Sequence, residues 1–363
     1  MRNTILATLL GPSDAGKTAI CEKLAGPLKK FALEKRTGVT LKTGYKSFLQ
    51  GDKTIYVLDN PGHESFSIEG LRNLDLADLA IYVVDGVLER GTAPYLRAQE
   101  HFRKTRSVLK AMGVPAVVCL NKADASNQEE MVSLYKDYGG ENSPMEIIPT
   151  STKTSKGLIH LKNFLKEHSP RDILHPKGVA ARIIKSFNVN PFNVKLPKIF
   201  GGVLGCYRYQ DLTEKSYNHT NCFSQNLSRL KVVNLEDHNQ VISTIETLMD
   251  PSLARNDHQK GTLILSEDFD HTRMSNLSQN LLLDLAYQAE TYNKGDKLCL
   301  LLLGQALHLV VKKTAKKKIW AVREKSKSNA AYLPLGVPAV LLGVEGKSYT
   351  IGGVCKDLSF TNL

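Results

Sequence analysis

The chain has 363 residues, of which 42% are hydrophobic and 23% charged, a globular balance that excludes a disordered chain. Its 48 Lys and Arg against 36 Asp and Glu give a net charge of +12, which favours a polyanionic partner, nucleic acid before an anionic membrane. No run reaches the ~18 apolar residues of a membrane-spanning helix, and the six cysteines are too dispersed for disulfides or zinc. We therefore expect a cytoplasmic protein in a reducing compartment, with no membrane partner.

Residues 1–172 alternate short apolar runs with amphipathic stretches, the pattern of a parallel sheet with crossover helices. Buried strands are expected at Thr4–Leu10, Thr54–Leu58, Leu79–Val84, Val114–Leu120 and Met145–Pro149. Two helices are expected over Tyr95–Met112, ending at Gly113, and over Gly157–His168. The linker at 169–178 contains two prolines and a glycine, and it marks the first domain boundary.

Beyond the linker the chain changes to short β-leaning segments separated by polar turns. The expected strands are Val179–Phe187, Phe200–Tyr207, Lys231–Ile245, Gly261–Leu265, Lys297–Val311, Lys318–Val322 and Pro338–Gly353. Short strands separated by polar turns are typical of antiparallel barrels rather than of further strand–helix–strand crossover units. We predict two β-barrel domains, at 178–272 and 273–363.

The loop after the first strand has the sequence Gly-Pro-Ser-Asp-Ala-Gly-Lys-Thr at 11–18, which matches the phosphate-loop pattern GxxxxGK[ST]. Its glycines let successive N–H groups point at phosphate oxygens, and the following helix adds a positive N-terminus. Lys17 is expected to contact the β- and γ-phosphates, and the Thr18 hydroxyl to bind Mg²⁺. A chance glycine turn is the alternative for this motif alone.

Two further motifs each follow an expected strand. Asp59 begins Asp-Asn-Pro-Gly-His and can hold Mg²⁺ through water, while the Gly62 N–H can meet the γ-phosphate. Asn121-Lys122-Ala123-Asp124 places a carboxylate that can accept two hydrogen bonds from guanine, whereas adenine would leave it unpaired. Each motif alone could be an acidic turn or a solvated loop. Three in this order predict that GTP or GDP binds with Mg²⁺.

Weaker candidates complete the predicted site. Thr40 could reach Mg²⁺ as a switch threonine, or be an ordinary strand residue. The residues after the fifth strand, at 151–153, could brace the base through backbone N–H groups. The predicted metal ligands are Thr18, Thr40 and Asp59; the predicted nucleotide-binding residues are Gly11, Ser13, Asp14, Ala15, Gly16, Lys17, Thr18, Gly62, Asn121, Lys122, Asp124, Ser151, Thr152 and Lys153. The fold class expected is an α/β P-loop GTPase domain followed by two antiparallel β-barrel domains.

The histidine that ends the motif at 59–63 resembles translational GTPases rather than Ras-like proteins. Four further segments, at 33–45, 181–190, 200–205 and 249–257, are similar to the gamma subunit of eukaryotic and archaeal translation initiation factor 2. The resemblance implies that His63 positions the attacking water. It also implies a heterotrimer with alpha and beta subunits that delivers methionyl initiator tRNA to the small ribosomal subunit and releases it after GTP hydrolysis.

The sequence departs from this family at several places. Pro12, Ser13 and Ala15 replace the usual residues of its phosphate loop, and Ser13 stands where an aliphatic residue would gate the catalytic histidine. Segment 46–53 lacks the cysteines of a zinc knuckle, so no zinc is expected. Segment 206–228 is shortened, which weakens the expected docking of the alpha subunit. Two alternatives stay open: a GTP-binding scaffold with weak hydrolysis, and a ribosome-assembly GTPase.

A run of five lysines lies within residues 312–318. It is either a solvated hairpin tip or a surface that binds RNA through phosphates. Trp320 is the chain's one tryptophan, and few aromatic residues lie nearby, so base stacking is not expected.

Overall fold

The computed structural model describes residues 4–26, 44–62, 70–139, 145–187, 200–213, 216–220, 228–236, 242–249, 262–269, 274–276, 280–324, 330–332, 337–346 and 348–361. The chain forms two compact units, one of Met1–Ile173 with Val344–Val354 and the other of Leu174–Gly343 with Cys355–Leu363. Among the described residues, no helix is both long and apolar enough to cross a membrane. The domain boundaries expected from sequence remain predictions.

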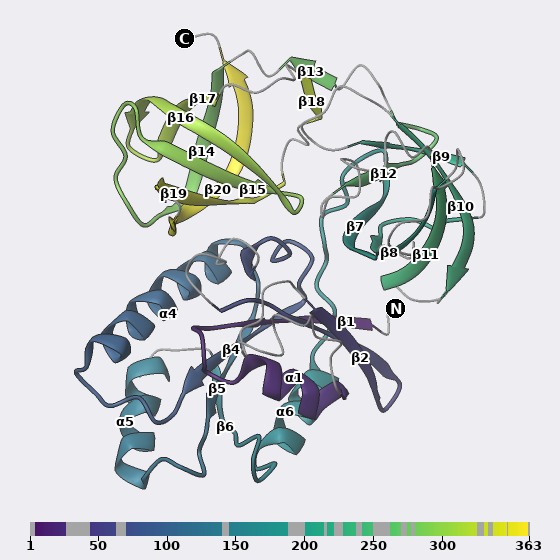
Figure 1. Ribbon diagram of the computed structural model, residues 1–363. Helices are drawn as coiled ribbons and strands as arrows, with labels where there is room; N and C mark the ends of the chain where they lie inside the picture. Colours follow the sequence, from purple (N-terminus) through teal and green to yellow (C-terminus); the bar gives the residue numbers. More distant parts are fainter. Residues whose placement is uncertain are drawn as a thin grey trace, which may run out of the picture. The chain divides into compact units, whose positions relative to one another are not determined.

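The first unit contains a six-stranded sheet with helices on both faces (Figure 1). Its elements are β1 (Thr4–Leu10), α1 (Lys17–Ala25), β2 (Gly44–Gln50), β3 (Lys53–Asp59), β4 (Leu79–Asp85), α4 (Ala93–Ala111), β5 (Ala116–Asn121), α5 (Gln128–Gly139), β6 (Glu146–Pro149) and α6 (Leu158–Glu167). The strand order is β2-β3-β1-β4-β5-β6. Because β3 and β4 flank β1 on opposite sides, the strand order reverses at β1, and in open α/β sheets ligands bind beside the carboxyl ends of the strands at such a point.

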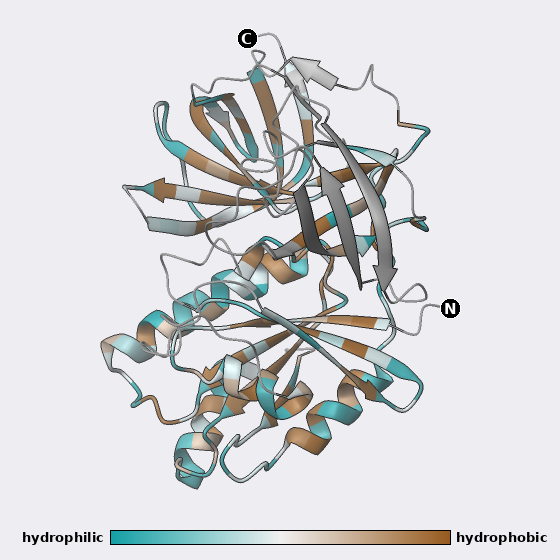
Figure 2. Cartoon of the chain, turned by 45° about the vertical axis from the view of Figure 1, so that its right-hand side comes forward, coloured by the Kyte–Doolittle hydropathy of each residue, from teal (hydrophilic) through white to brown (hydrophobic). Residues whose placement is uncertain are grey.

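The sheet buries an apolar layer on each face. Alternate residues of β1, β3, β4 and β5 pack against α1 and α6, with Ile20 of α1 and Leu161 of α6 fully buried. On the other face Phe102 of α4 packs edge-on against Tyr82 of β4 and also contacts Tyr138 of α5. A strand that is covered on both faces has apolar side chains at nearly every position, because neither face contacts water. The hydropathy colouring of Figure 2 shows such apolar stretches in the central strands of this sheet.

The expected strands and helices of this unit are confirmed within a few residues, and Gly113 ends α4 as predicted. Gly113 has φ +66°, and the N–H groups of Gly113 and Val114 donate to the carbonyls of Lys110 and Leu109, a Schellman arrangement.

Two expectations about this unit were wrong or incomplete. The sheet is mixed rather than parallel, because the edge strand β2 pairs antiparallel with β3. Helix α5 was not predicted, although Asn127 and Glu130 cap it reciprocally through their side chains. That Asn-x-x-Glu pattern was readable in the sequence.

The second unit contains strands from two closed six-stranded barrels, as predicted. The first barrel consists of β7 (Val179–Phe187), β8 (Phe200–Arg208), β9 (Ser216–Thr220), β10 (Ser228–Glu236), β11 (Ile242–Met249) and β12 (Leu263–Leu265). The second consists of β14 (Asn280–Gln288), β15 (Lys297–Leu302), β16 (Gln305–Ala315), β17 (Lys318–Arg323), β19 (Ala339–Glu345) and β20 (Ser348–Thr361). The short strands β13 (Met274–Asn276) and β18 (Ala330–Tyr332) pair with each other.

Three segments expected as single strands are each divided between two. Segment 297–311 is a hairpin of β15 and β16, segment 231–245 falls on β10 and β11, and segment 338–353 falls on β19 and β20. The β15–β16 turn is two residues long, with φ +47° at Leu303 and +76° at Gly304, as in a type I′ turn. Leucine seldom adopts positive φ, so the apolar run concealed this turn.

Candidate functional site

The loop between β1 and α1 is shaped by two glycines whose backbones require the absence of a Cβ. Gly11 has φ +129°, and a Cβ there would lie 2.2 Å from the Val83 carbonyl oxygen. Gly16 has φ +93°, and a Cβ there would lie 2.2 Å from Asn121 Nδ2. The loop therefore lies against the ends of β4 and β5, where any larger residue would displace it.

Lys17, the first residue of α1, folds back over this loop. Its Nζ donates to the carbonyl oxygens of Gly11 at 2.9 Å and Pro12 at 2.6 Å. Burial lowers the pKa of Lys17 from 10.5 to about 8, and the charges of Asp59 and Asp14 partly oppose that effect. A Cβ on Gly62 would lie 2.1 Å from Lys17 Nζ and 2.8 Å from the backbone carbonyl oxygen of Pro12, so a larger residue would push the loop at 59–62 away from the phosphate loop.

The carboxyl end of β3 brings an acidic group to the same place. Asp59 is buried, and its Oδ2 accepts a 2.8 Å hydrogen bond from the Thr18 hydroxyl. The next residue, Asn60, fixes this end of the strand through Nδ2, which donates to Thr8 Oγ1 at 2.8 Å and to the Leu9 carbonyl at 3.1 Å. A hydroxyl and a carboxylate held together are the oxygen ligands that Mg²⁺ prefers when a nucleotide phosphate and water supply the rest. Thr18 and Asp59 thus fit a magnesium site.

The carboxyl end of β5 presents the Asn-Lys-Ala-Asp motif beside the phosphate loop. Asn121 Nδ2 donates 2.9 Å to the Ala15 carbonyl, which ties the motif to the loop. Lys122 has φ +62°, and its Nζ lies 2.7 Å from Asp85 Oδ2. Asp124 is exposed at the rim, as a base-binding carboxylate must be before its ligand arrives.

The segment after β6 supports that carboxylate. Ser151 Oγ donates to Asp124 Oδ1 at 2.5 Å and itself accepts from the Thr154 N–H. The Ser151 hydrogen bond is the largest cause of a lowered pKa at Asp124, with Lys153 contributing less. Gly157 keeps this segment close to β6, because a Cβ there would lie 2.0 Å from the Pro149 carbonyl oxygen.

The remaining predicted residues have the following positions. Ala15 is buried in the apolar core below the loop, while Ser13 is half-buried and Asp14 is exposed at φ +61°. Thr152 is half-buried and Lys153 exposed beside Ser151. The predicted metal ligand Thr40 and the predicted catalytic His63 lie outside the described residues, as does the segment 27–43. In the part of the chain that the structure describes, no three His, Cys, Asp or Glu side chains group to hold a metal ion.

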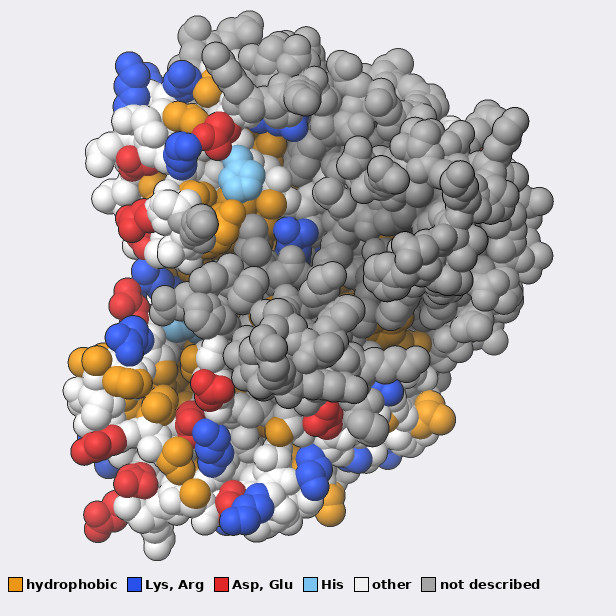
Figure 3. Space-filling view, viewed as in Figure 1, with side chains coloured by type: hydrophobic (Ala, Val, Ile, Leu, Met, Phe, Trp, Pro, Cys, Tyr) orange, Lys and Arg blue, Asp and Glu red, His pale blue; other side chains and the backbone are white. Residues whose placement is uncertain are grey.

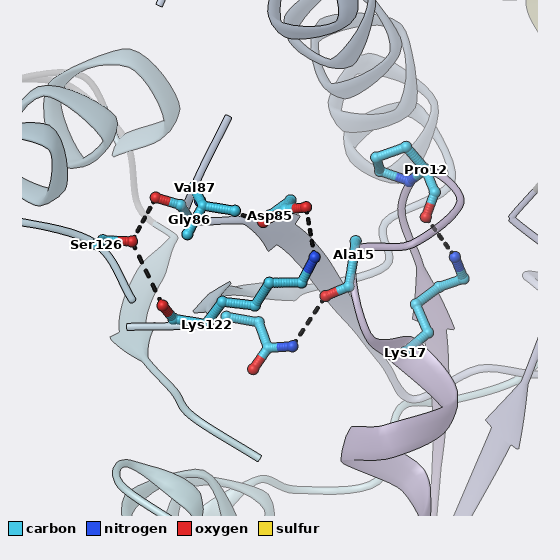
Figure 4. Close-up of polar contacts among 9 residues, drawn as sticks. Pro12, Ala15, Lys17, Asp85, Gly86, Val87, Lys122 and Ser126 are labelled. Atoms are coloured by element: carbon cyan, nitrogen blue, oxygen red, sulfur yellow. Dashed lines mark hydrogen bonds and ion pairs between the residues drawn. The ribbon is translucent and has the colours of Figure 1, made fainter. Parts of the chain in front are cut away.

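Sequence reasoning missed three residues behind the base-binding motif (Figure 4). Asp85 ends β4, and besides holding Lys122 it accepts a 3.1 Å hydrogen bond from the Val87 N–H. Ser126 Oγ donates to the Gly86 carbonyl at 2.5 Å, and the Gly86 N–H donates to the Asn121 carbonyl. Asp85 carried the signal used for Asp59: a carboxylate directly after a buried strand.

Residues 2–171 match the protein family described as the elongation factor Tu GTP binding domain. The match covers most of the first unit, which is therefore similar to that GTP binding domain. This similarity agrees with the expected type of domain and with a guanine nucleotide, and it leaves the individual site residues as predictions.

Among curated proteins, similarity is found to translation initiation factor IF-2 of Helicobacter pylori strain 26695, with 32% identity over 168 residues. The same factor of Finegoldia magna is 30% identical over 163 residues. The first alignment covers 43% of this chain but 16% of the relative, so the chain spans about a sixth of that relative's length. Neither relative is the gamma subunit that the sequence resembles, and that finer resemblance is not established by these matches.

Solved structures with the same fold cover nearly the whole chain. A bacterial selenocysteine-specific elongation factor gives a TM-score of 0.72 at 20% identity, covering 98% of this chain and 58% of its own. SelB of Methanococcus maripaludis with a GTP analogue gives 0.68 at 16% identity, covering 98% and 78%. The Ski7 GTPase-like domain of S. cerevisiae, bound to GDP and inorganic phosphate, gives 0.67 at 12% identity, covering 97% of both chains. At these identities the likeness confirms the fold, a GTPase domain followed by β-barrels.

Proposed function

We propose that the chain binds and hydrolyses GTP with Mg²⁺ and uses the nucleotide state to hold and release methionyl initiator tRNA. The convergence of Lys17, Thr18 and Asp59 with the base-binding Asp124 at the carboxyl ends of neighbouring strands supports a guanine nucleotide site. The initiation factors among the relatives and the resemblance to the gamma subunit support a role in initiation. A nucleotide-dependent grip on a charged tRNA is the kind of switch that such a site can drive.

The nucleotide-site residues have separate proposed roles. Lys17 neutralises the β- and γ-phosphates, and Thr18 with Asp59 holds Mg²⁺, which supplies charge stabilisation to the transferring phosphoryl group. Asp124 selects guanine, with Ser151 orienting its carboxylate and Lys122 held in place by Asp85. Gly62 and Thr40 would sense the γ-phosphate, and His63 would position water for attack.

The proposed setting follows from the resemblance to the gamma subunit. The cargo would be delivered to the small ribosomal subunit in the cytoplasm, and the chain would work in a heterotrimer with alpha and beta subunits. Those two subunits rest on the resemblance alone.

Filter binding of charged tRNA tests the cargo. The full chain is titrated with methionyl initiator tRNA, methionyl elongator tRNA and uncharged initiator tRNA, each with GDP or a non-hydrolysable GTP analogue. We expect tight binding only for methionyl initiator tRNA with the analogue. Asp124→Asn should abolish the difference between the two nucleotide states, because the variant keeps one acceptor but sets an NH₂ donor against the second N–H donor of guanine. Equal affinity for all three tRNAs contradicts the proposed cargo, and selective retention of ribosomal RNA would favour a ribosome-assembly GTPase.

A GTP-binding scaffold with weak hydrolysis is the second candidate, favoured by Ser13. This half-buried polar residue occupies the position where the resembled family has an aliphatic gate. Single-turnover GTP hydrolysis on small ribosomal subunits distinguishes the candidates. Loss of a water-positioning base costs roughly 100-fold or more, so we expect His63→Ala to slow hydrolysis by that factor. Equal rates for the two proteins would favour the scaffold.

A further inference from the structure

The second barrel carries a hairpin whose tip, Lys312–Lys318, is exposed at every residue. We call it the lysine tip. It joins β16 to β17 and contains five lysines and no acidic residue. Lys316, at φ +50°, turns the chain. A concentrated positive charge on a protruding loop is the electrostatic feature that polyanions bind.

Strand register places part of this charge around the chain's one tryptophan. A bulge between Val311 and Lys313 shifts the β16–β17 pairing, so that Lys313 lies opposite Trp320. On β17 Ile319 and Ala321 are fully buried, so the alternating Lys318 and Trp320 lie on the outer face of the barrel. Lys313 Nζ lies 5.3 Å from the centre of the Trp320 ring, a cation–π contact. Trp320 is therefore a direct reporter of anything that binds the lysine tip.

Neighbouring groups leave the charge of the tip largely uncompensated. Among the described residues the lysines of the tip make no ion pair, whereas Lys297 of the same barrel pairs with Glu324 at 2.5 Å. Lys317 Nζ donates to the Ala286 carbonyl at 3.4 Å. Asp284 lies opposite Lys318 across β14 and β17, but its Oδ2 pairs with Lys356 at 3.3 Å. Figure 3 shows Lys and Arg side chains at the upper left of the face drawn, with Asp and Glu side chains among them.

We propose that the lysine tip binds the phosphate backbone of RNA. The choice of RNA over an anionic membrane rests in part on the proposed function in translation. It rests also on the absence of any exposed large hydrophobic side chain among the described residues of this barrel, since membrane-surface segments insert such side chains. The contact is to phosphates, so it carries affinity rather than sequence preference.

The test is a salt series on the full chain in the GDP state, with polyuridylate and a 20-base-pair RNA duplex as probes and Trp320 fluorescence as the signal. Each phosphate contact contributes about 0.7 to the slope of log affinity against log salt on a single strand and about 0.9 on a duplex. The variant Lys312→Gln/Lys316→Gln/Lys318→Gln should therefore lower the slope by about two units on the single strand and nearly three (about 2.7) on the duplex, and weaken binding about tenfold or more. All three side chains are exposed, so the fold should persist.

The matched control removes the same charge from the GTP-binding domain. Lys23, Lys110 and Lys136 are exposed on α1, α4 and α5, and Lys23→Gln/Lys110→Gln/Lys136→Gln should keep the wild-type slope. Equal slopes in the lysine-tip and control variants would show that only net charge matters and would overturn the proposal. So would a change of Trp320 emission with phosphatidylserine vesicles as large as with RNA.

This experiment is independent of the tRNA test above, because it is done in the GDP state with RNAs that carry no amino acid. If the lysine tip binds RNA but the chain shows no preference for methionyl initiator tRNA, only the proposed cargo is rejected. If the chain prefers that tRNA but the lysine-tip variant keeps the wild-type salt slope, only the proposed role of the lysine tip is rejected.

Discussion

Lys17 is buried although its ammonium group is positively charged, and burial disfavours that charge, so its protonation state should respond to pH. Burial lowers its pKa to about 8, although two loop carbonyls accept hydrogen bonds from its ammonium group. In the unfolded chain the same lysine keeps its proton up to about pH 10.5. Between these two values the unfolded state binds more protons, so the free energy of unfolding of the nucleotide-free chain rises with pH over this window.

Nucleotide affinity should respond to pH in the opposite direction. Phosphates beside Lys17 raise its pKa, so above about pH 8 binding must take up a proton. We expect the affinity for a fluorescent GDP analogue to be flat from pH 7 to 8. Above pH 8 it should fall, with a slope approaching one log unit per pH unit. In Lys17→Arg the slope should vanish, because guanidinium keeps its proton. A wild-type affinity that stays flat to pH 9 would contradict the pKa assigned to Lys17.

At the scale of elements, the site depends on how strand ends are held together. Asp78, at the start of β4, is fully buried and accepts hydrogen bonds from the Leu6 N–H at 2.7 Å and the Arg171 N–H at 2.8 Å. The Arg171 guanidinium donates to the carbonyls of Met112 at 2.8 Å and Asp75 at 2.9 Å. This clasp fixes β1, β4 and the segment that leaves α6 in one arrangement. It lies at the opposite end of the strands from the phosphate loop.

Removing the Asp78 carboxylate should destabilise the whole GTP-binding domain. Asp78→Ala leaves the buried Leu6 N–H and the part-buried Arg171 N–H without their acceptor. A buried group of this kind costs about 1 to 3 kcal/mol and a part-buried one less, so the free energy of unfolding should fall by about 2 to 4 kcal/mol. Asp78→Asn keeps one acceptor oxygen and should lose less. Urea unfolding followed by circular dichroism measures both, with Glu129→Ala on the exposed face of α5 as the control. A loss for Asp78→Ala no larger than that control would show that the clasp is dispensable.

At the scale of the whole molecule, two optical signals arise from different units. Every helix of the described residues lies between Lys17 and Glu167, so the helical circular dichroism reports on the first unit. The single tryptophan, Trp320, lies in the second unit. The two signals therefore follow the unfolding of the two units separately within the intact chain.

GDP should separate these two transitions. A ligand present at 100 times its Kd stabilises the state that binds it by about 2.7 kcal/mol. Added GDP with Mg²⁺ should therefore raise the midpoint of the circular dichroism transition by several degrees and move the Trp320 transition less. A parallel titration with ADP is the control and should move neither, because adenine offers no donors to Asp124. Equal shifts of both transitions with GDP would show that the two units unfold as one cooperative body.

The sequence by itself determined which residues follow each buried strand, and this was enough to predict a guanine nucleotide and the residues that would hold it. Glycine at positions 11 and 16, the carboxylates at 59 and 124 and the apolar runs before them are local features. Local features report the backbone conformation of their own segment, so they predicted strand, loop and helix correctly near the site. The same reasoning failed at Leu303, where a leucine adopts the positive φ normally left to glycine or asparagine.

Only the tertiary structure decided which strand ends are neighbours. The order β3-β1-β4-β5-β6 sets Asp85 beside Lys122 and Ser151 beside Asp124, although 37 and 27 residues separate these pairs along the chain. In the second barrel, the pairing of β16 with β17 makes the lysine run, for which the sequence left two interpretations open, an exposed tip with Lys313 opposite Trp320. Contacts of this kind depend on strand pairing across the sheet, and pairing is selected by the packing of the whole core rather than by any short stretch of sequence.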